Sequence, residues 1–422
     1  MAIDLTTIRK KLFSPASYSI GSTLALQGFA LLGFMLLVRM ISIEQMGLWA
    51  IWLALIAIAD MSRQGLVRNG LIRFSLQNTE GQPEWQSAGL VLDLLMTLLL
   101  SPALMVGGLV LASMSQEPST AALAWWAFPF CLLQGLGRYA ETIQIARSDF
   151  QGIFWANTLN GTLQFGWLMI YFLEDEMPTF GTLIGIQCAG IAVGLVFTLF
   201  YRSSYFRFGK IEKEKCLALF HFGKYVAGTN FLSLLFQRLD TLLISIFLTP
   251  AAVAVYNVAT RLNGLLDLPL NGFSQALYPR IASEVAGSSS MQDVYGKNVR
   301  QLLWVQTPLT LILVLVAPFL VRLLAGEAYL QAVPLFQLLG LAGLVKPWGR
   351  TFGMTLDALG KSDFNFKLLL LSMVVNLSFS LLLMPVFGIV GAAVATGCGT
   401  VTTIAIGQFY LRKKLAVRPW SF

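Results

Sequence analysis

Apolar stretches recur along the whole chain, and they restrict how it can fold more than any other feature. A helix needs roughly 20 mostly apolar residues to cross the hydrocarbon of a bilayer. Hydrophobic residues make up 56% of this sequence and charged residues only 12%, about half the share usual in soluble proteins. Because backbone polar groups in lipid must be satisfied within one segment, the stretches are predicted to be helices rather than open strands. The sequence therefore predicts an all-α integral membrane protein.

The apolar stretches form two sets of six, which predicts 12 transmembrane helices. The first set lies near 17–41, 47–62, 87–113, 121–140, 152–173 and 179–201, and the second near 222–247, 252–278, 301–325, 329–357, 365–385 and 388–411. The predicted domains are an N-lobe (1–201), a polar interlobe linker (202–220), a C-lobe (221–412) and a tail (413–422). The linker could take the form of a helix on the membrane surface. No cleavable signal peptide is expected, because the first apolar segment is too long.

The second set repeats the first at a fixed distance of 207 residues, as in 225 − 18. The matched residues are Tyr18 and Tyr225, Gly21 and Gly228, Trp49 and Tyr256, Asp60 and Asp267, and Arg73 and Arg280. Much later, Pro178-Thr-Phe-Gly181 recurs as Pro385-Val-Phe-Gly388. A constant offset indicates a duplicated half. We expect two pseudo-symmetric six-helix lobes that superpose by rotation about the membrane normal, since each repeat holds an even number of helices.

Basic residues between the predicted spans set the orientation. With both termini in the cytoplasm, the internal loops and tails collect Arg9, Lys10, Lys11, Arg63, Arg68, Arg73, Arg147, the linker bases, Arg280, Lys297, Arg300, Lys361, Lys367 and Arg412 to Lys414. The external loops hold only Arg39 and Arg322. The net charge of +8 is therefore attributed to topology and anionic lipid headgroups. No soluble basic face with exposed aromatics is present, so nucleic acid is not an expected partner.

Metal and nucleotide chemistry have no support in the sequence. The four cysteines (Cys131, Cys188, Cys216 and Cys398) lack metal-ligand or disulfide spacing, and His221 is the only histidine. No glycine-rich loop that could hold a nucleotide phosphate is present. We therefore expect no cofactor and a transporter rather than an enzyme.

Charged residues inside the predicted spans are the candidates for function, because a charge at membrane depth costs roughly 2.5–3.5 kcal/mol on insertion scales. They are Asp60, Asp93, Arg138, Glu141, Arg238, Asp240, Arg261, Asp267, Lys346, Arg350 and Asp357. Arg138 and Glu141, one turn apart, fit either a structural ion pair or a functional site. Lys346 and Arg350 are four residues apart and repel each other, so an anion or an acid from another helix is expected between them. We favour a cavity ligand for that pair.

Two motifs resemble a known family. Gln237-Arg-Leu-Asp240, Tyr256, Arg261-Leu and Leu277-Tyr-Pro-Arg-Ile-Ala282 resemble the seventh and eighth helices of bacterial polysaccharide flippases of the Wzx type. Phe387-Gly-Ile-Val-Gly-Ala-Ala-Val-Ala395 resembles their twelfth helix. These flippases belong to the multidrug/oligosaccharidyl-lipid/polysaccharide (MOP) exporter superfamily, whose MATE-like plan of six plus six helices covers nearly the whole chain. The resemblance identifies the superfamily better than the substrate.

The resemblance implies alternating access between two lobes with a cationic central cavity. The cavity would hold the pyrophosphate of an undecaprenyl-linked oligosaccharide at the bacterial inner membrane, for surface polysaccharides such as the O-antigen of lipopolysaccharide. By position, its bases would be Arg238, Arg261 and Lys346 or Arg350, oriented by Asp240 and Asp267, with Arg138 as a further candidate. Arg73 and Arg280 are expected at the cytoplasmic gate. Membrane lipids and polysaccharide polymerase machinery are the other expected partners.

Three questions stay open at this point. Coupling to protons or sodium through Asp240, Asp267 or Glu141 is an alternative to drive by the membrane potential alone. A multidrug cation antiporter of the same superfamily would share the architecture but have an acidic cavity. A membrane glycan polymerase or ligase usually has a large external loop, whereas every external connection predicted here is short.

Overall fold

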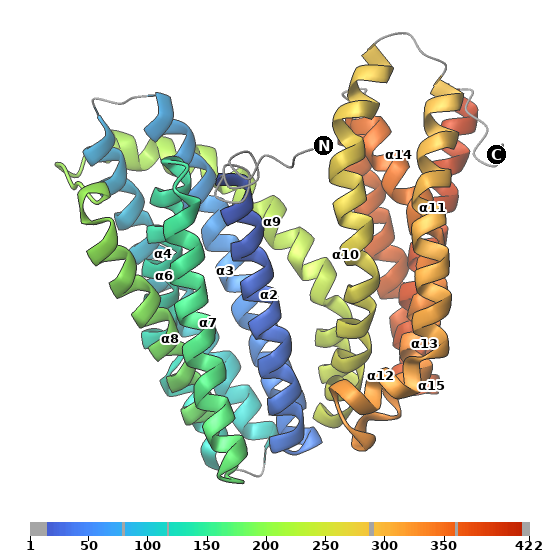
Figure 1. Ribbon diagram of the computed structural model, residues 1–422, viewed down its shortest axis with the longest axis horizontal. Coiled ribbons are helices and arrows are strands. Elements are labelled where there is room, and N and C mark those ends of the chain that lie inside the picture. The colour runs from blue at the N-terminus through green and yellow to red at the C-terminus, as the bar shows by residue number, and fades with distance from the viewer. Residues whose placement is uncertain (1–14, 78–80, 116–117, 287–290, 359–361, 416–422) are drawn as a thin grey trace, which may run out of the picture. The chain divides into compact units, whose positions relative to one another are not determined.

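The computed structural model describes residues 15–77, 81–115, 118–286, 291–358 and 362–415, and these ranges contain helices and no strand (Figure 1). Contacts divide them into two units, which are described separately. Unit 1 comprises the described residues up to Ser42 and Ile51–Gln237, and unit 2 comprises Ile43–Ala50 and the described residues from Arg238. The lobe boundaries inferred from the sequence stay a prediction.

Unit 1 is a helical bundle. Its helices are α2 (Pro15–Met40), most of α3 (Ile43–Gln77), α4 (Gln82–Met114), α5 (Ala122–Trp125), α6 (Ala127–Ala146), α7 (Phe150–Leu173), α8 (Phe180–Tyr201) and the first part of α9 (Lys213–Phe247). Helix α2 packs on α7, α7 on α8, and α4 on α6 (Figure 1). Polar caps begin two of them, since Asp149 accepts a hydrogen bond from Gly152 N and Thr179 accepts one from Thr182 N.

Unit 2 is a second bundle. It contains the end of α9, α10 (Pro250–Ala286), α11 (Met291–Leu315), α12 (Ala317–Leu324), α13 (Ala332–Ala342), α14 (Lys346–Ala358) and α15 (Ser362–Leu415). Helix α10 packs on α11 and α13, and α15 packs on α13 and α14. Short 3-10 turns at Pro118–Ala121, Ser203–Tyr205, Glu327–Tyr329 and Gly343–Val345 connect helices in the two units.

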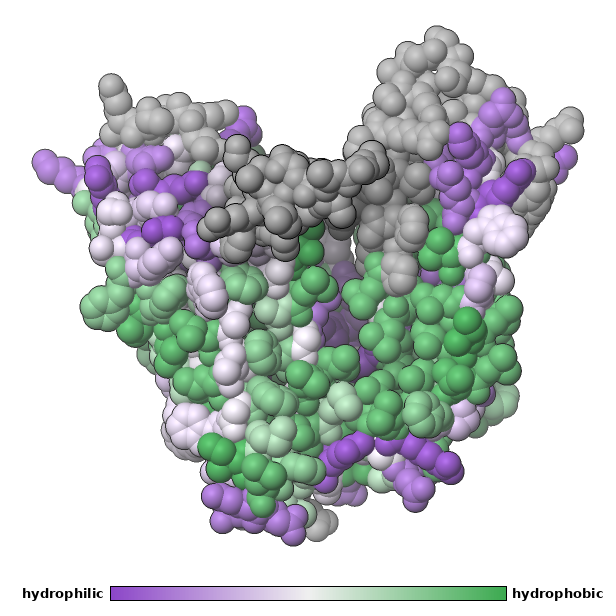
Figure 2. Space-filling model, viewed as in Figure 1, coloured by the Kyte–Doolittle hydropathy of each residue, from purple (hydrophilic) through white to green (hydrophobic). Residues whose placement is uncertain are grey.

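Length and composition identify membrane spans among these helices. Six described helices are long and apolar enough to cross a bilayer, or up to eight if each sharply bent pair is one span. In each unit, Figure 2 shows hydrophobic residues along the middle of the visible face and hydrophilic residues at its ends. The protein is a multi-pass membrane protein, while the count of 12 spans stays a prediction.

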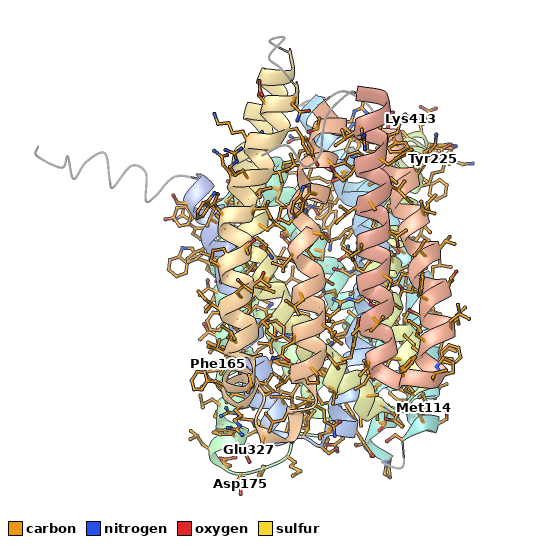
Figure 3. The ribbon with its side chains drawn as sticks, turned by 90° about the vertical axis from the view of Figure 1, so that its right-hand side faces the viewer. Met114, Phe165, Asp175, Tyr225, Glu327 and Lys413 are labelled. Carbon is orange, nitrogen blue, oxygen red and sulfur yellow. The ribbon has the colours of Figure 1, made fainter. Side chains whose placement is uncertain are left out.

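The ends of the helices agree with the charge pattern of the sequence. Within unit 1, Asp175 lies at the opposite end from Tyr225 (Figure 3). Within unit 2, Glu327 lies at the opposite end from Lys413 (Figure 3). In each unit the loop that was predicted to be external therefore lies away from the segment predicted to face the cytoplasm. Which end faces the cytoplasm stays a prediction.

The helix boundaries repeat at the distance found in the sequence. Helix α2 ends at Met40 and α9 at Phe247, and α3 begins at Ile43 and α10 at Pro250, so both pairs are 207 residues apart. The repeated Pro-x-Phe-Gly motif begins α8 in one half and marks a break in α15 in the other, where Gly388 has a φ of 57°. A positive φ of this kind is readily adopted only by glycine. The superposition of the two halves is still a prediction.

Several predicted boundaries were wrong. Helix α3 continues to Gln77 instead of ending at 62, and the predicted helix 329–357 is divided into α13, a 3-10 turn and α14. The predicted helices 365–385 and 388–411 form the single kinked α15. Proline at the start of α12 accompanies a 71° bend within the predicted helix 301–325.

The polar linker is held on unit 1 and does not form a surface helix. After the turn Ser203–Tyr205, the chain follows the beginning of α4 without regular structure until α9 begins at Lys213. Gln86 donates to the Tyr205 carbonyl at 3.1 Å and accepts from Arg207 N at 2.9 Å. Ser87 bonds both the carbonyl and the N–H of Gly209. The linker therefore satisfies its backbone through two side chains of α4.

Helices α3 and α9 approach closely within unit 1 because glycine lies at their crossing. A Cβ at Gly223 would overlap the backbone of Leu66, whereas one at Gly228 would meet nothing within 4 Å. We predict that Gly223→Ala lowers the thermal unfolding midpoint of the purified protein, since overpacking costs about 1–3 kcal/mol. Gly228→Ala, the control on the same helix, should leave it unchanged or raise it. Equal midpoints for the two variants would contradict this account of the crossing.

Candidate functional site

Unit 1 contains a buried network of charges centred on Arg63 of α3. Its Nη2 forms an ion pair with Asp60 Oδ1 at 2.5 Å, and its Nη1 donates to the Cys131 carbonyl at 2.9 Å. The third nitrogen, Nε, lies 3.6 Å from Asp93 Oδ1 on α4. Arg63 is 2% exposed, and both carboxylates are buried. One guanidinium thus connects α3, α4 and α6.

Arg138 of α6 extends the network. Its Nη1 lies 2.8 Å from Glu141 Oε2, which confirms that these two residues form a pair, and its Nε lies 3.4 Å from Asp60 Oδ2. Gln64 donates to the same Asp60 oxygen at 2.7 Å. Asp60 therefore receives two guanidinium groups and one amide, and the interpretation of Arg138 and Glu141 as a structural bridge has direct support.

The sequence placed Arg63 in a cytoplasmic loop, and this was wrong. Hydropathy along one segment counts each charge as a cost. The partners that offset the charge of Arg63 lie on the neighbouring turn and on α4, which is distant in sequence. With these partners the helix can continue, and its later bases Arg68 and Arg73 reach Gln64 and the ring of Phe222. A carboxylate at the position of Asp93 was the signal that could have suggested the pairing.

A polar cavity of about 80 Å³ adjoins this network within unit 1. Arg138 and Glu141 line it together with amide and hydroxyl side chains from α6, α7 and α8, namely Gln134, Gln144, Asn157, Asn160 and Thr198. Sequence reasoning missed these amides because it considered only ionisable residues. Their presence inside otherwise apolar segments was the available signal.

In unit 2, Asp240 of α9 is held by neutral groups. Its Oδ2 accepts hydrogen bonds from Tyr256 Oη of α10 and Thr396 Oγ1 of α15, both at 2.7 Å. Asn376, also on α15, donates to Thr396 Oγ1 at 3.2 Å. Asp240 was expected to orient a nearby base, and among the described residues it is oriented by hydroxyl groups instead.

Two arginines lie close to Asp240 in sequence or structure without forming a printed ion pair with it. Arg261 Nε donates to the amide oxygen of Asn257 at 3.1 Å. Arg238 Nε is buried and has no hydrogen-bond partner among the described residues. The positive charges of Arg238 and Arg261 influence each other. This part of unit 2 is therefore rich in positive charge, as the sequence predicted for Arg238 and Arg261.

Lys346 of α14 is paired with an acid from another helix. Its Nζ lies 2.8 Å from Asp267 Oδ1 and 3.0 Å from Oδ2, and Asp267 belongs to α10. Both side chains line an open hollow of about 280 Å³ together with Gly349, Arg350 and Ile404. Arg350 is exposed there and has no ion-pair partner among the side chains that the structure describes. Of the two partners considered for Lys346, the acid is the one observed.

The two units repeat one ion pair. Asp60 and Asp267 are 207 residues apart, and their basic partners Arg138 and Lys346 are 208 residues apart. In each unit the pair joins an acid on α3 or α10 to a base on α6 or α14. The duplication seen in the sequence is thus present in the side-chain contacts, with arginine in one half and lysine in the other.

The two candidate gate residues have different outcomes. Arg73 is exposed and lies 5.2 Å from the centre of the Phe222 ring within unit 1. The side chain of Arg280 lies outside the described residues. Their role at a gate stays a prediction. Across the described part of the chain, no group of three or more His, Cys, Asp or Glu residues could hold a metal ion.

The sequence matches a known family and several of its members. A family described as polysaccharide biosynthesis protein matches residues 36–334. The teichuronic acid biosynthesis protein TuaB of Bacillus subtilis is 22% identical, over 65% of this chain and 57% of its own. The probable low-salt glycan biosynthesis flippase Agl15 of Haloferax volcanii is 24% identical, over 54% of this chain and 49% of its own. The chain spans about half the length of the curated relatives it matches.

Two solved structures have the same fold. An inward-facing multidrug resistance MATE family transporter of the MOP superfamily has a TM-score of 0.75 at 14% identity, covering 92% of this chain and 94% of that one. The lipid II flippase MurJ in an inward closed conformation has a TM-score of 0.74 at 12% identity, covering 94% and 87%. These neighbours establish the MATE-like helical architecture that was predicted.

The network in unit 1 leads to a stability prediction. Arg63→Ala would leave the buried carboxylates of Asp60 and Asp93 without their shared base, and breaking a buried pair in this way costs about 3–5 kcal/mol. We expect a large fall in the thermal unfolding midpoint, or loss of the folded protein from the membrane. Arg68→Ala is the matched control on α3, because Arg68 bonds only the amide of Gln64 in the network. If the two variants were equally stable, Arg63 would not hold the unit together.

Proposed function

Because the chain belongs to the polysaccharide biosynthesis protein family, we propose that it translocates a lipid-linked oligosaccharide across a membrane. The relatives TuaB and Agl15, named for teichuronic acid biosynthesis and as a glycan biosynthesis flippase, support this function. The observation that carries it is the surplus of bases in unit 2, where Arg238 and Arg350 lack carboxylate partners among the described residues. The substrate proposed from this surplus is an undecaprenyl-pyrophosphate-linked repeat unit.

The proposed ligand for these bases is the pyrophosphate. Guanidinium groups form two parallel hydrogen bonds to phosphate oxygens, and a charge-assisted bond is roughly twice as strong as a neutral one. Arg350, exposed beside the open hollow, can reach a ligand without first breaking an ion pair. Lys346 would have to exchange Asp267 for phosphate, so we assign it a secondary contact. Arg261 and Arg138 are candidate contacts of the same kind.

The proposed mechanism is alternating access in the bacterial inner membrane, with both termini in the cytoplasm. The lipid tail stays in the bilayer while the charged group crosses. An inside-negative potential of 100 mV releases about 2.3 kcal/mol for each negative charge that moves outward. The same bases argue against a multidrug cation antiporter, because they would repel a cationic drug and leave their own charges without partners. The proposal includes contact with membrane lipids and with polysaccharide polymerase machinery.

Asp240 is the proposed site for coupling to a cation. Glu141 and Asp267 already bind Arg138 and Lys346, whereas Asp240 is bound only by neutral groups. Its Oδ1, the Asn376 amide oxygen and the Ser380 hydroxyl are buried oxygens without hydrogen-bond partners, and Ser380 is one turn from Asn376 on α15. A carboxylate with amide and hydroxyl oxygens is a donor set that suits a hard cation such as Na⁺.

Export of glycan tests the role of the unpaired bases. We predict that Arg238→Ala and Arg350→Ala each abolish export in cells while protein level in the membrane is unchanged. Arg350→Lys should restore export only in part, because lysine supplies charge without the planar fork. Arg322→Ala is the control, since Arg322 is also an exposed base of unit 2 but lies near Glu327. Normal export by both alanine variants at the first two positions would refute the proposed anionic ligand.

Thermal stability tests the cation site independently of glycan. Na⁺ at 100 times its Kd would add about 2.7 kcal/mol to the stability of the purified protein, compared with choline as the cation. We expect this increase to vanish in Asp240→Asn and to weaken in Ser380→Ala. Ser245→Ala is the control on α9, because the Ser245 hydroxyl bonds the Leu242 carbonyl of its own helix. An equal response of the wild type to Na⁺ and choline would contradict a sodium site.

A further inference from the structure

The charge network of unit 1 contains more acids than bases. Its carboxylates are Asp60, Asp93 and Glu141, and its guanidinium groups are those of Arg63 and Arg138. With every group ionised, the network would have a net charge of −1. Asp60, Arg63 and Asp93 are all buried, at 8%, 2% and 3% exposure. Because an uncompensated charge in such surroundings is costly, the network is most stable when one carboxyl group carries a proton.

The contacts distinguish the three carboxyl groups. Asp60 has both arginines and the amide of Gln64 as partners. Glu141 lies 2.8 Å from Arg138, and its side chain is 22% exposed beside the cavity. Asp93 has only the longer 3.6 Å contact from Arg63 Nε to its Oδ1. Its Oδ2 is buried and has no hydrogen-bond partner.

The groups facing Asp93 do not stabilise its charge beyond Arg63. From α3 it faces Arg63 and the like charge of Asp60. From α6 it faces the Cys131 thiol and Tyr139, but the Tyr139 hydroxyl donates to the Gln86 carbonyl instead. On α4, the Thr97 hydroxyl donates to the backbone carbonyl of Asp93 rather than to its carboxylate. The remaining charges of the network, Arg138 and Glu141, are bound to each other.

We propose that Asp93 is a proton-binding site of unit 1, with the proton on the unpartnered Oδ2. The proton comes from water and returns to water, and no other bond changes. Its route begins at the polar cavity, where Glu141 and Arg138 are accessible, and follows the contacts of Arg138 with Asp60 and of Asp60 with Arg63. This site is separate from the cation site at Asp240 and does not depend on the identity of the transported substrate.

Binding and release of the proton would change how α3 and α4 pack. Neutral Asp93 attracts Arg63 weakly, which agrees with their 3.6 Å contact. Ionised Asp93 would attract the guanidinium more strongly and compete with Asp60 for it. Gly135 of α6 lies directly against both groups, since a Cβ there would meet Arg63 Nη1 and Asp93 Oδ2. A shift of the guanidinium would therefore also reach α6.

Infrared spectroscopy of the protein in lipid membranes tests the site directly, because a protonated carboxyl group has a C=O stretch that a carboxylate lacks. We expect the wild type to show this band at neutral pH and to lose it as the pH rises. Asp93→Asn, which is similar in shape, should remove that component. Asp149→Asn is the control, because the Asp149 carboxylate is paired with Arg202 outside the network. Persistence of the whole band in Asp93→Asn, or loss of that component in Asp149→Asn, would overturn the proposal.

Isotope labelling gives a test that needs no variant. If Asp93→Asn does not fold, wild-type protein with carbon-13 in its aspartate carboxyl groups should shift the band, and protein labelled in glutamate should not. A shift with glutamate alone would assign the proton to Glu141 and overturn the proposal. Labelled Asp240→Asn protein separates Asp93 from Asp240, because the shifted component should persist in it. Its disappearance there would place the proton at Asp240.

Discussion

The ion pair between an acid on the second helix and a base on the fourth helix of each half is the constraint on which the structure depends. Asp60 meets Arg138 in unit 1, and Asp267 meets Lys346 in unit 2. A charge at membrane depth is tolerated only where protein or water satisfies it, so each acid fixes which helix can pack beside it. The same interaction, repeated at nearly the same distance in sequence, gives the two halves a common internal framework.

The two halves use that framework differently. In unit 1, Arg63 and Asp93 join the pair and form a network that closes on itself with one excess acid. In unit 2, the positions that correspond to Arg63 and Asp93 at an offset of 207 are Leu270 and Arg300, so the pair stays small. Arg238, Arg261 and Arg350 then add positive charge without a matching set of acids. The division assigns proton chemistry to unit 1 and anion binding to unit 2.

The sequence predicted helical membrane architecture, the duplication and the turns after Met40 and Phe247, because apolar length and Pro or Gly punctuation act locally. It could not predict that α3 passes Arg63 or that Lys346 binds Asp267, because these partners lie 30 and 79 residues away in sequence. The pairing of Arg138 with Glu141 was predictable, since both lie on one turn of one helix. The amides around the cavity of unit 1 carry no formal charge, which is why a search for ionisable residues did not find them.

Translocation by the purified protein in liposomes tests the central claim most directly. Undecaprenyl-pyrophosphate-linked oligosaccharide would be placed in both leaflets, and an enzyme added outside would modify only the glycan exposed there. The account predicts that the protein makes the inner-leaflet glycan accessible to the enzyme, while a cationic dye is not transported. Transport of the dye without movement of the glycan would contradict the account and would favour a multidrug antiporter.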